Sequence, residues 1–198
     1  MSGKHVAKDQ PATFEFDANN QKRIQEILKK YPAERKKSAV MPLLDLAQRQ
    51  HDNWIPNAAI KKIGEILEVP YIKVYEVATF YTMYNLAPVG KYFVQVCTTS
   101  PCMIRGSDKI VNLCKKHISE NEGKLSSDKK ASWIEVECLG ACVSAPMMQI
   151  NDDFYEDLTE ETATKIFEGI KNDKLPKPGS QKGRVGFEPS KRLSLVKN

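Results

Sequence analysis

The sequence contains no apolar stretch long enough to cross a bilayer, because no hydrophobic run approaches the about 18 residues that a spanning helix needs. Its N-terminal segment lacks the apolar core of a secretory signal and the arginines of a mitochondrial transit peptide. We therefore expect no direct membrane insertion and a reducing compartment. In such a compartment, clustered cysteines are more often metal ligands than disulfides.

The usual signatures of nucleotide binding and of covalent catalysis are also missing. The sequence has no Gly-rich dinucleotide fingerprint, no P-loop and no Cys/His nucleophile pair. It also lacks the C-x-x-C motif that is typical of thiol–disulfide exchange. We predict no catalytic residue, and we do not expect the chain to oxidise NADH by itself.

Positive charge is concentrated at the C-terminus of a chain whose formal net charge is +5. Residues 171–198 contain eight Lys or Arg residues and two acidic residues, with several Pro and Gly residues that disfavour a core. Phe187, the single aromatic residue there, gives no stacking platform for nucleic acid. We expect an extended basic tail over residues 173–198, either strapped across a partner subunit or disordered, and no nucleic-acid partner.

Four of the five cysteines form two pairs, Cys97 with Cys102 and Cys138 with Cys142. Four thiols from two loops make a site for an iron–sulfur cluster or a zinc ion. The C-x4-C and C-x3-C spacings are looser than those of most zinc sites and favour a [2Fe-2S] cluster. A zinc-stabilised binding module and a dithiol function remain alternatives. Cys114 lies on the apolar stripe of a predicted helix, where a core position is expected.

The N-terminal half of the sequence predicts a helical bundle. Residues 1–17 show no periodicity and are interpreted as a flexible lead-in. Over residues 18–87, apolar residues recur at helical spacing in four segments. The predicted helices begin near Asn20, Ser38, Asn57 and Pro70.

Residues 88–172 predict a small α/β domain, so the whole chain is expected to be α+β. Two β-branched and aromatic runs, Tyr92–Val96 and Trp133–Glu137, are predicted strands, and each leads directly into a cysteine. Thr98–Pro101 is predicted to be a loop. The domain is completed by a helix at residues 107–119, a hairpin at residues 147–155 and a second helix at residues 159–170. Both cysteine pairs should therefore lie at one end of the sheet.

Three segments carry a resemblance to a known family: VATFYTMYNLAPVG, CTTSPC and CLGACVSAP. Together they resemble the E subunit of NADH–quinone oxidoreductase, respiratory complex I, whose mitochondrial form is the 24-kilodalton flavoprotein subunit. The resemblance implies a thioredoxin-like domain behind the bundle. It also implies one [2Fe-2S] cluster, with Cys97, Cys102, Cys138 and Cys142 as ligands. Related small subunits occur in diaphorase modules of NAD-linked hydrogenases and formate dehydrogenases.

The resemblance also implies partners and a location. The cluster would exchange electrons with FMN on a larger flavoprotein subunit, which carries the NADH site, and a large iron–sulfur subunit would lie nearby. This chain would hold no FMN itself. The expected location is the peripheral arm of complex I at the cytoplasmic face of a bacterial inner membrane. The matrix side of the mitochondrial inner membrane is the alternative.

Overall fold

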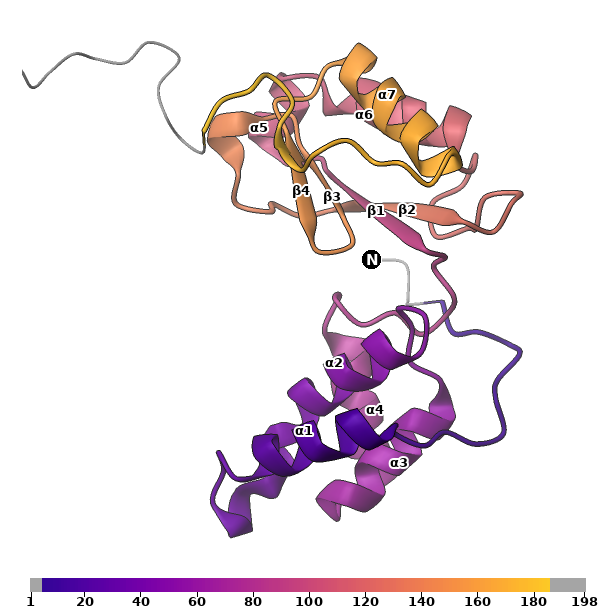
Figure 1. The fold of residues 1–198 in the computed structure, drawn as a ribbon, viewed down its shortest axis with the longest axis vertical. Helices are drawn as coiled ribbons and strands as arrows, with labels where there is room; N and C mark the ends of the chain where they lie inside the picture. The colour runs from indigo at the N-terminus through magenta and orange to yellow at the C-terminus, as the bar shows by residue number, and fades with distance from the viewer. Residues whose placement is uncertain (1–4, 186–198) are drawn as a thin grey trace, which may run out of the picture. The chain divides into compact units, whose positions relative to one another are not determined.

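The chain forms two compact units, Met1–Val89 and Gly90–Asn198, in a computed structural model that describes residues 5–185 (Figure 1). The division falls after Val89, two residues from the boundary expected between residues 87 and 88. No helix among the described residues has the length and apolar character needed to cross a membrane.

The N-terminal unit contains four α-helices, which confirms the helices expected from the periodicity. They are α1 (Ala18–Leu28), α2 (Val40–Gln50), α3 (Asn57–Leu67) and α4 (Tyr71–Phe80). A 3-10 segment, η1 (Ala33–Ala39), precedes α2, and the apolar pattern did not distinguish it from the helix that follows.

Helix α1 begins two residues before the expected start because Asp17 caps it. The Asp17 carboxylate accepts a hydrogen bond from the backbone N–H of Asn20 at 2.7 Å. Such a bond satisfies one of the N–H groups that the first turn of a helix leaves without an intrahelical partner.

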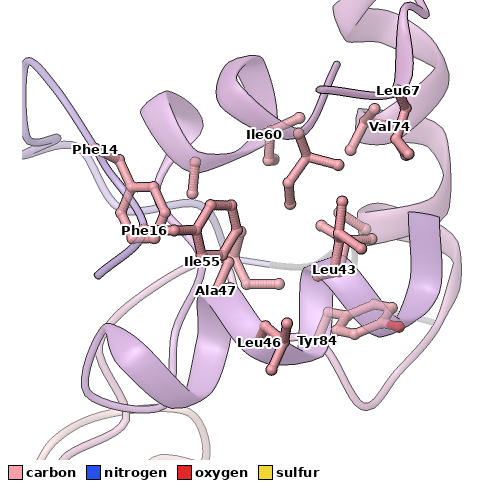
Figure 2. Close-up of a cluster of buried hydrophobic side chains, with 14 of the residues drawn as sticks. Phe14, Phe16, Leu43, Leu46, Ala47, Ile55, Ile60, Leu67, Val74 and Tyr84 are labelled. Atoms are coloured by element: carbon pink, nitrogen blue, oxygen red, sulfur yellow. The ribbon is translucent and has the colours of Figure 1, made fainter. Parts of the chain in front are cut away.

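The core of this unit is formed by side chains from α1 to α4 and from the segment before α1. Figure 2 shows the side chains of Leu43, Ile60 and Val74 pointing toward one another in the space between the helices. Phe14 and Phe16 also belong to this core, with ring centroids 5.0 Å apart in an edge-to-face contact. The expectation of a flexible lead-in over residues 1–17 therefore differs from the structure, which packs these two rings. Residues 1–4 lie outside the described part of the chain.

The C-terminal unit is built on a five-stranded sheet in the order β2-β1-β3-β4-β5. Strands β1 and β2 are parallel, β3 is antiparallel to β1 and to β4, and β5 is parallel to β4. The strands are β1 (Tyr92–Cys97), β2 (Ala131–Val136), β3 (Met148–Ile150), β4 (Asp153–Glu156) and β5 (Gly179–Ser180). The first four confirm the expected strands and hairpin.

Two long helices, α6 (Ser107–His117) and α7 (Glu160–Lys171), pack together and share one core with the sheet (Figure 1). Cys114 is fully buried in this core, as expected. One prediction was wrong: the segment expected to be a loop at Thr98–Pro101 leads into a short helix, α5 (Ser100–Ile104). Pro101 fits there because a proline at the start of a helix loses no hydrogen bond.

The basic tail expected over residues 173–198 is partly integrated into the sheet. Gly179 and Ser180 pair with the edge strand β4, and the Gln181 N–H donates to the Glu156 carbonyl at 2.9 Å. Arg184 then forms an ion pair with Asp157. Pro and Gly content suggested an extended chain, but backbone pairing of two residues gives no periodic signal. Residues 186–198, which include Phe187, lie outside the described residues.

Candidate metal centre

The sheet brings the two cysteine pairs to the same edge. Cys97 is the last residue of β1 and lies opposite Val136, the last residue of β2, in a parallel register. Because neighbouring parallel strands end at one edge, Cys138 follows β2 on the same side as Cys97. Cys102 lies in α5, which begins just after β1. The predicted convergence of strand ends therefore results from the β1–β2 pairing.

The first pair is enclosed, since Cys97 and Cys102 are each only 1% exposed. Their sulfurs lie in a small apolar cluster with Ala145 and Met147, beside Phe154. Met147 also directs its backbone N–H to the Cys102 thiol. Met147 is buried beside these sulfurs, whereas the side chain of Met103, the residue after Cys102, is exposed.

The second pair lies in an exposed loop. The sulfurs of Cys138 and Cys142 are 3.4 Å apart, and the N–H of Gly140 points at the Cys138 sulfur from 3.4 Å. Gly140 has a φ of 86°, a backbone conformation that residues with a Cβ adopt only with strain. The loop therefore depends on glycine at this position to aim an N–H group at a sulfur.

Two groups connect the pairs. The Thr99 hydroxyl lies 3.4 Å from the Cys97 sulfur and also hydrogen-bonds with the Cys138 thiol. The backbone N–H of Leu139, in the second loop, points at the Cys97 sulfur of the first. Thiols of the two pairs also influence each other electrostatically, because negative charge on Cys97 raises the pKa of Cys138. The structure thus brings all four predicted ligands into one site.

In the first pair, the two thiols have opposite pKa shifts. Burial is the largest influence on Cys97 and raises its pKa, but hydrogen bonds from Thr99 and Leu139 outweigh it, and the pKa lies below its usual value. Burial raises the pKa of Cys102 to about 12, and the neighbouring Cys97 adds to this effect.

The second pair repeats this division. The Gly140 N–H, followed by the Cys142 thiol, lowers the pKa of Cys138. The hydrogen bond with Cys138 is the main reason why the pKa of Cys142 is raised. In each pair, therefore, one thiol loses its proton more readily than the other, because a second negative charge beside the first is repelled. A metal cation held by both sulfurs would remove this repulsion and favour loss of both protons.

The donor set of the site is four cysteine sulfurs, which can bind a [2Fe-2S] cluster or a structural zinc ion. Across residues 5–185, no three His, Cys, Asp or Glu side chains are grouped so that they could hold a single metal ion. A [2Fe-2S] cluster divides four thiolates between two irons, and the sulfurs here lie as two hydrogen-bonded pairs, Cys97 with Cys102 and Cys138 with Cys142. The N–H and hydroxyl groups aimed at the sulfurs also suit a negatively charged cluster.

Comparison with known proteins agrees with this geometry. The family model described as thioredoxin-like [2Fe-2S] ferredoxin matches residues 24–171. Over 160 residues, the chain is 54% identical to the E subunit of NADH-quinone oxidoreductase from Rickettsia bellii, covering 81% of this chain and 96% of the relative. The chain belongs to the E-subunit family of NADH-quinone oxidoreductase. The predicted fold class and the [2Fe-2S] cofactor are thereby confirmed for this member of the family.

The chain is also similar to a mitochondrial protein and, in fold, to a hydrogenase. It is 48% identical over 184 residues to the mitochondrial NADH dehydrogenase [ubiquinone] flavoprotein 2 of Dictyostelium discoideum, covering 92% of this chain and 74% of the relative. The solved structure of an NAD⁺-reducing [NiFe]-hydrogenase superposes on this chain with a TM-score of 0.61 and 17% sequence identity. The match covers 70% of this chain and 23% of the hydrogenase chain. The hydrogenase likeness concerns the fold alone.

Sequence reasoning did not find every residue that supports the site. The Thr99 hydroxyl, in the segment that was predicted to be a loop, contacts a thiol of each pair. The Leu139 N–H and Arg184 were missed. The first is a backbone group with no side-chain signature, and the second lies 42 positions after Cys142 in a segment with no regular pattern.

Proposed function

We propose that Cys97, Cys102, Cys138 and Cys142 hold the [2Fe-2S] cluster with which this chain acts as an electron-transfer subunit in the NADH dehydrogenase module of respiratory complex I. When bound, such a cluster takes up and passes on single electrons. The observation that carries the assignment is the gathering of two thiol pairs at the shared edge of β1 and β2.

The residues around the sulfurs have separate roles in this proposal. Cys97 and Cys102 anchor one side of the site in the domain, where Met147 and Ala145 exclude water. The Leu139 and Gly140 N–H groups direct positive dipoles at the sulfurs, which stabilises added negative charge. The chain lacks the motifs for binding NADH, so the substrate is oxidised on another subunit.

The exposed pair supports a direction for electron exchange. Cys138 and Cys142 are both exposed, and so are the apolar side chains of Val143, the residue after Cys142, and of Ile104, two residues after Cys102. Thiolate ligands at the surface shorten the path to an external electron carrier. In our proposal this carrier is FMN on the larger flavoprotein subunit, which also binds NADH, and the large iron–sulfur subunit lies nearby.

The location follows from these partners. As part of NADH-quinone oxidoreductase, the chain belongs to the peripheral region of the complex, consistent with its lack of a membrane-crossing helix in residues 5–185. The identity to the Rickettsia relative supports the cytoplasmic face of a bacterial inner membrane. The matrix side of the mitochondrial inner membrane is the alternative, supported by the Dictyostelium relative.

Anaerobic purification of the full chain, separated from its neighbouring subunits so that only its own iron is counted, tests the proposal. We expect iron and acid-labile sulfide in equal amounts on this chain and, after dithionite reduction, a rhombic EPR signal from one cluster. Cys138→Ser should remove or strongly perturb this signal, and Cys114→Ser, the matched control in the core, should leave it unchanged. Zinc without sulfide, or loss of the signal in Cys114→Ser alone, would contradict the ligand assignment.

A further inference from the structure

Arg184 makes the most extensive side-chain network among the groups close to the second cysteine pair. Its Nε donates to Asp157 Oδ2 at 2.9 Å and its Nη2 donates to Asp157 Oδ1 at 2.9 Å. Asp157 is only 5% exposed, and its Oδ2 also accepts a hydrogen bond from the Ser180 hydroxyl at 2.6 Å. A two-pronged, buried ion pair of this kind fixes the guanidinium in position.

The same guanidinium contacts the two residues that follow Cys142. Its Nη2 donates to the Ser144 hydroxyl at 2.8 Å and to the Val143 carbonyl at 3.2 Å. The Asp157 backbone N–H adds a bond to the Ser144 carbonyl at 2.7 Å. Nη2 has two hydrogens for three acceptors, so at least one of its bonds is shared. We call this set of bonds, centred on Arg184 and Asp157, the clamp.

The segment that follows Cys142 is a single 3-10 turn, η2 (Cys142–Ser144). Within it, the Ser144 N–H donates to the Ala141 carbonyl and the Ala145 N–H donates to the Cys142 carbonyl. Cys142 itself is exposed, whereas Ser144 and Ala145 are buried. Bonds from Arg184 and Asp157 therefore add to this burial in tying the turn to the folded sheet.

We propose that Arg184 is a positioning residue that fixes the sulfur of Cys142 by holding the Val143–Ser144 turn. The proposal rests on the assignment of Cys142 as a cluster ligand. Groups outside the ligand shell orient ligands, and their loss typically costs 10–100-fold in metal affinity or activity, so about tenfold is the effect to expect here. Because Asp157 balances the charge of Arg184, the clamp acts mainly through geometry rather than through net charge.

The geometry requires an arginine rather than any cation. A planar guanidinium reaches both oxygens of Asp157 and still directs an N–H group at Val143 and Ser144. A lysine ammonium is a single point with a flexible stem and cannot reproduce this fork. Arg184→Lys therefore keeps the charge and loses part of the positioning.

The main test compares two double variants of the full chain, each carrying its cluster. Asp157→Asn with Arg184→Gln removes the clamp without leaving a buried charge unpaired. Lys91→Gln with Asp173→Asn removes a more exposed ion pair, 2.7 Å long, together with the Lys130–Asp173 contact, near the beginning of β1, the end opposite Cys97. The readouts are the rate of iron release to a ferrous chelator, the g-values of the reduced cluster, and the thermal unfolding of the protein.

We expect the clamp variant to release iron about tenfold faster than the wild type and to show shifted g-values. The Lys91/Asp173 variant should match the wild type in both readouts, and Arg184→Lys should fall between the two. Wild-type release rates and g-values in a folded clamp variant would overturn the proposal. So would equal acceleration in both double variants, because this would indicate general destabilisation.

If the clamp variant does not fold, a further variant tests the proposal. Ser144→Ala removes one acceptor of Arg184 and keeps the ion pair, so it should accelerate iron release in the same direction but by less. Unchanged release and an unchanged spectrum in Ser144→Ala would then overturn the proposal. Absence of a cluster from the wild-type chain would instead overturn the proposed function. The presence of the cluster in the wild type is therefore established before any variant is measured.

Discussion

The two cysteine pairs differ in how the chain holds them. Cys97 and Cys102 are buried and lie within regular structure, at the end of a central strand and in the helix that follows it. Cys138 and Cys142 are exposed, the first in a loop and the second at the start of a single 3-10 turn, and they are supported by single N–H groups and by a segment much later in the chain. The first pair is thus part of the domain core, whereas the second depends on tertiary hydrogen bonds.

Replacing one proposed ligand from each pair gives the largest expected effect. Cys102→Ala and Cys142→Ala should both abolish the [2Fe-2S] EPR signal. In the cluster-free proteins, however, Cys102→Ala should lower the free energy of unfolding by about 1 kcal/mol, because it leaves a small cavity. Cys142→Ala, at an exposed position, should change it by less than about 0.5 kcal/mol. Urea unfolding measures the difference, and equal values would contradict the contrast between the pairs.

The backbone of the exposed loop can be tested at its glycine. Gly140→Ala places a Cβ at a φ of 86° and should cost about 1–2 kcal/mol of stability while misdirecting the N–H that faces Cys138. Gly123, at a φ of 70° with open space around its Cα, is the matched control. Both variants should be destabilised to a similar extent, but only Gly140→Ala should alter the EPR spectrum. A normal spectrum in Gly140→Ala would show that this N–H is dispensable.

The contact that joins the pairs predicts a smaller effect. Thr99→Val removes a hydroxyl that touches Cys97 and Cys138 and keeps the shape of the side chain. Reduction adds negative charge, which the hydroxyl stabilises, so its loss should lower the potential by roughly 40 mV, equivalent to about 1 kcal/mol for one electron. Redox titration checks this, with Thr98→Val as the control. An unchanged or raised potential in Thr99→Val would contradict the role of the hydroxyl.

The end of β1 opposite the cysteines should affect stability alone. Hydrogen bonds from Lys130 and then Lys91 lower the pKa of Asp173 below its usual range. A carboxyl group with a lowered pKa stabilises the fold above its unfolded-state pKa, near about 4, and this contribution is lost as the pH falls through the folded-state pKa. Asp173→Asn should therefore be less stable than the wild type at pH 7, and the gap should narrow in acid.

Urea unfolding at several pH values measures this gap, and spectra of the cluster at neutral pH provide the control. A gap that stays constant down to strongly acidic pH would show that the carboxylate charge does not contribute. An altered cluster spectrum in Asp173→Asn would show that the two ends of β1 are coupled.

The sequence predicted those parts of the molecule that repeat or pair locally. Apolar spacing revealed the four N-terminal helices, and the runs before Cys97 and Cys138 predicted the two strands whose parallel pairing gathers the thiols. Phe14 and Phe16 were missed because two aromatic side chains on an irregular segment have no period. The Arg184 contacts were missed for a related reason, since a bond between residues 27 positions apart depends on the completed fold.

The burial of Cys114 has a consequence for how the cofactor is installed. Burial raises the pKa of this thiol far above its usual value and keeps it in the protonated, unreactive form. Cys114 also belongs to the core formed with α6 and α7, apart from the cluster that contains the sulfurs of Cys97 and Cys102. A cluster assembled on the folded chain would therefore not use Cys114 as a ligand. A cluster that included the Cys114 sulfur would require the domain to unfold first.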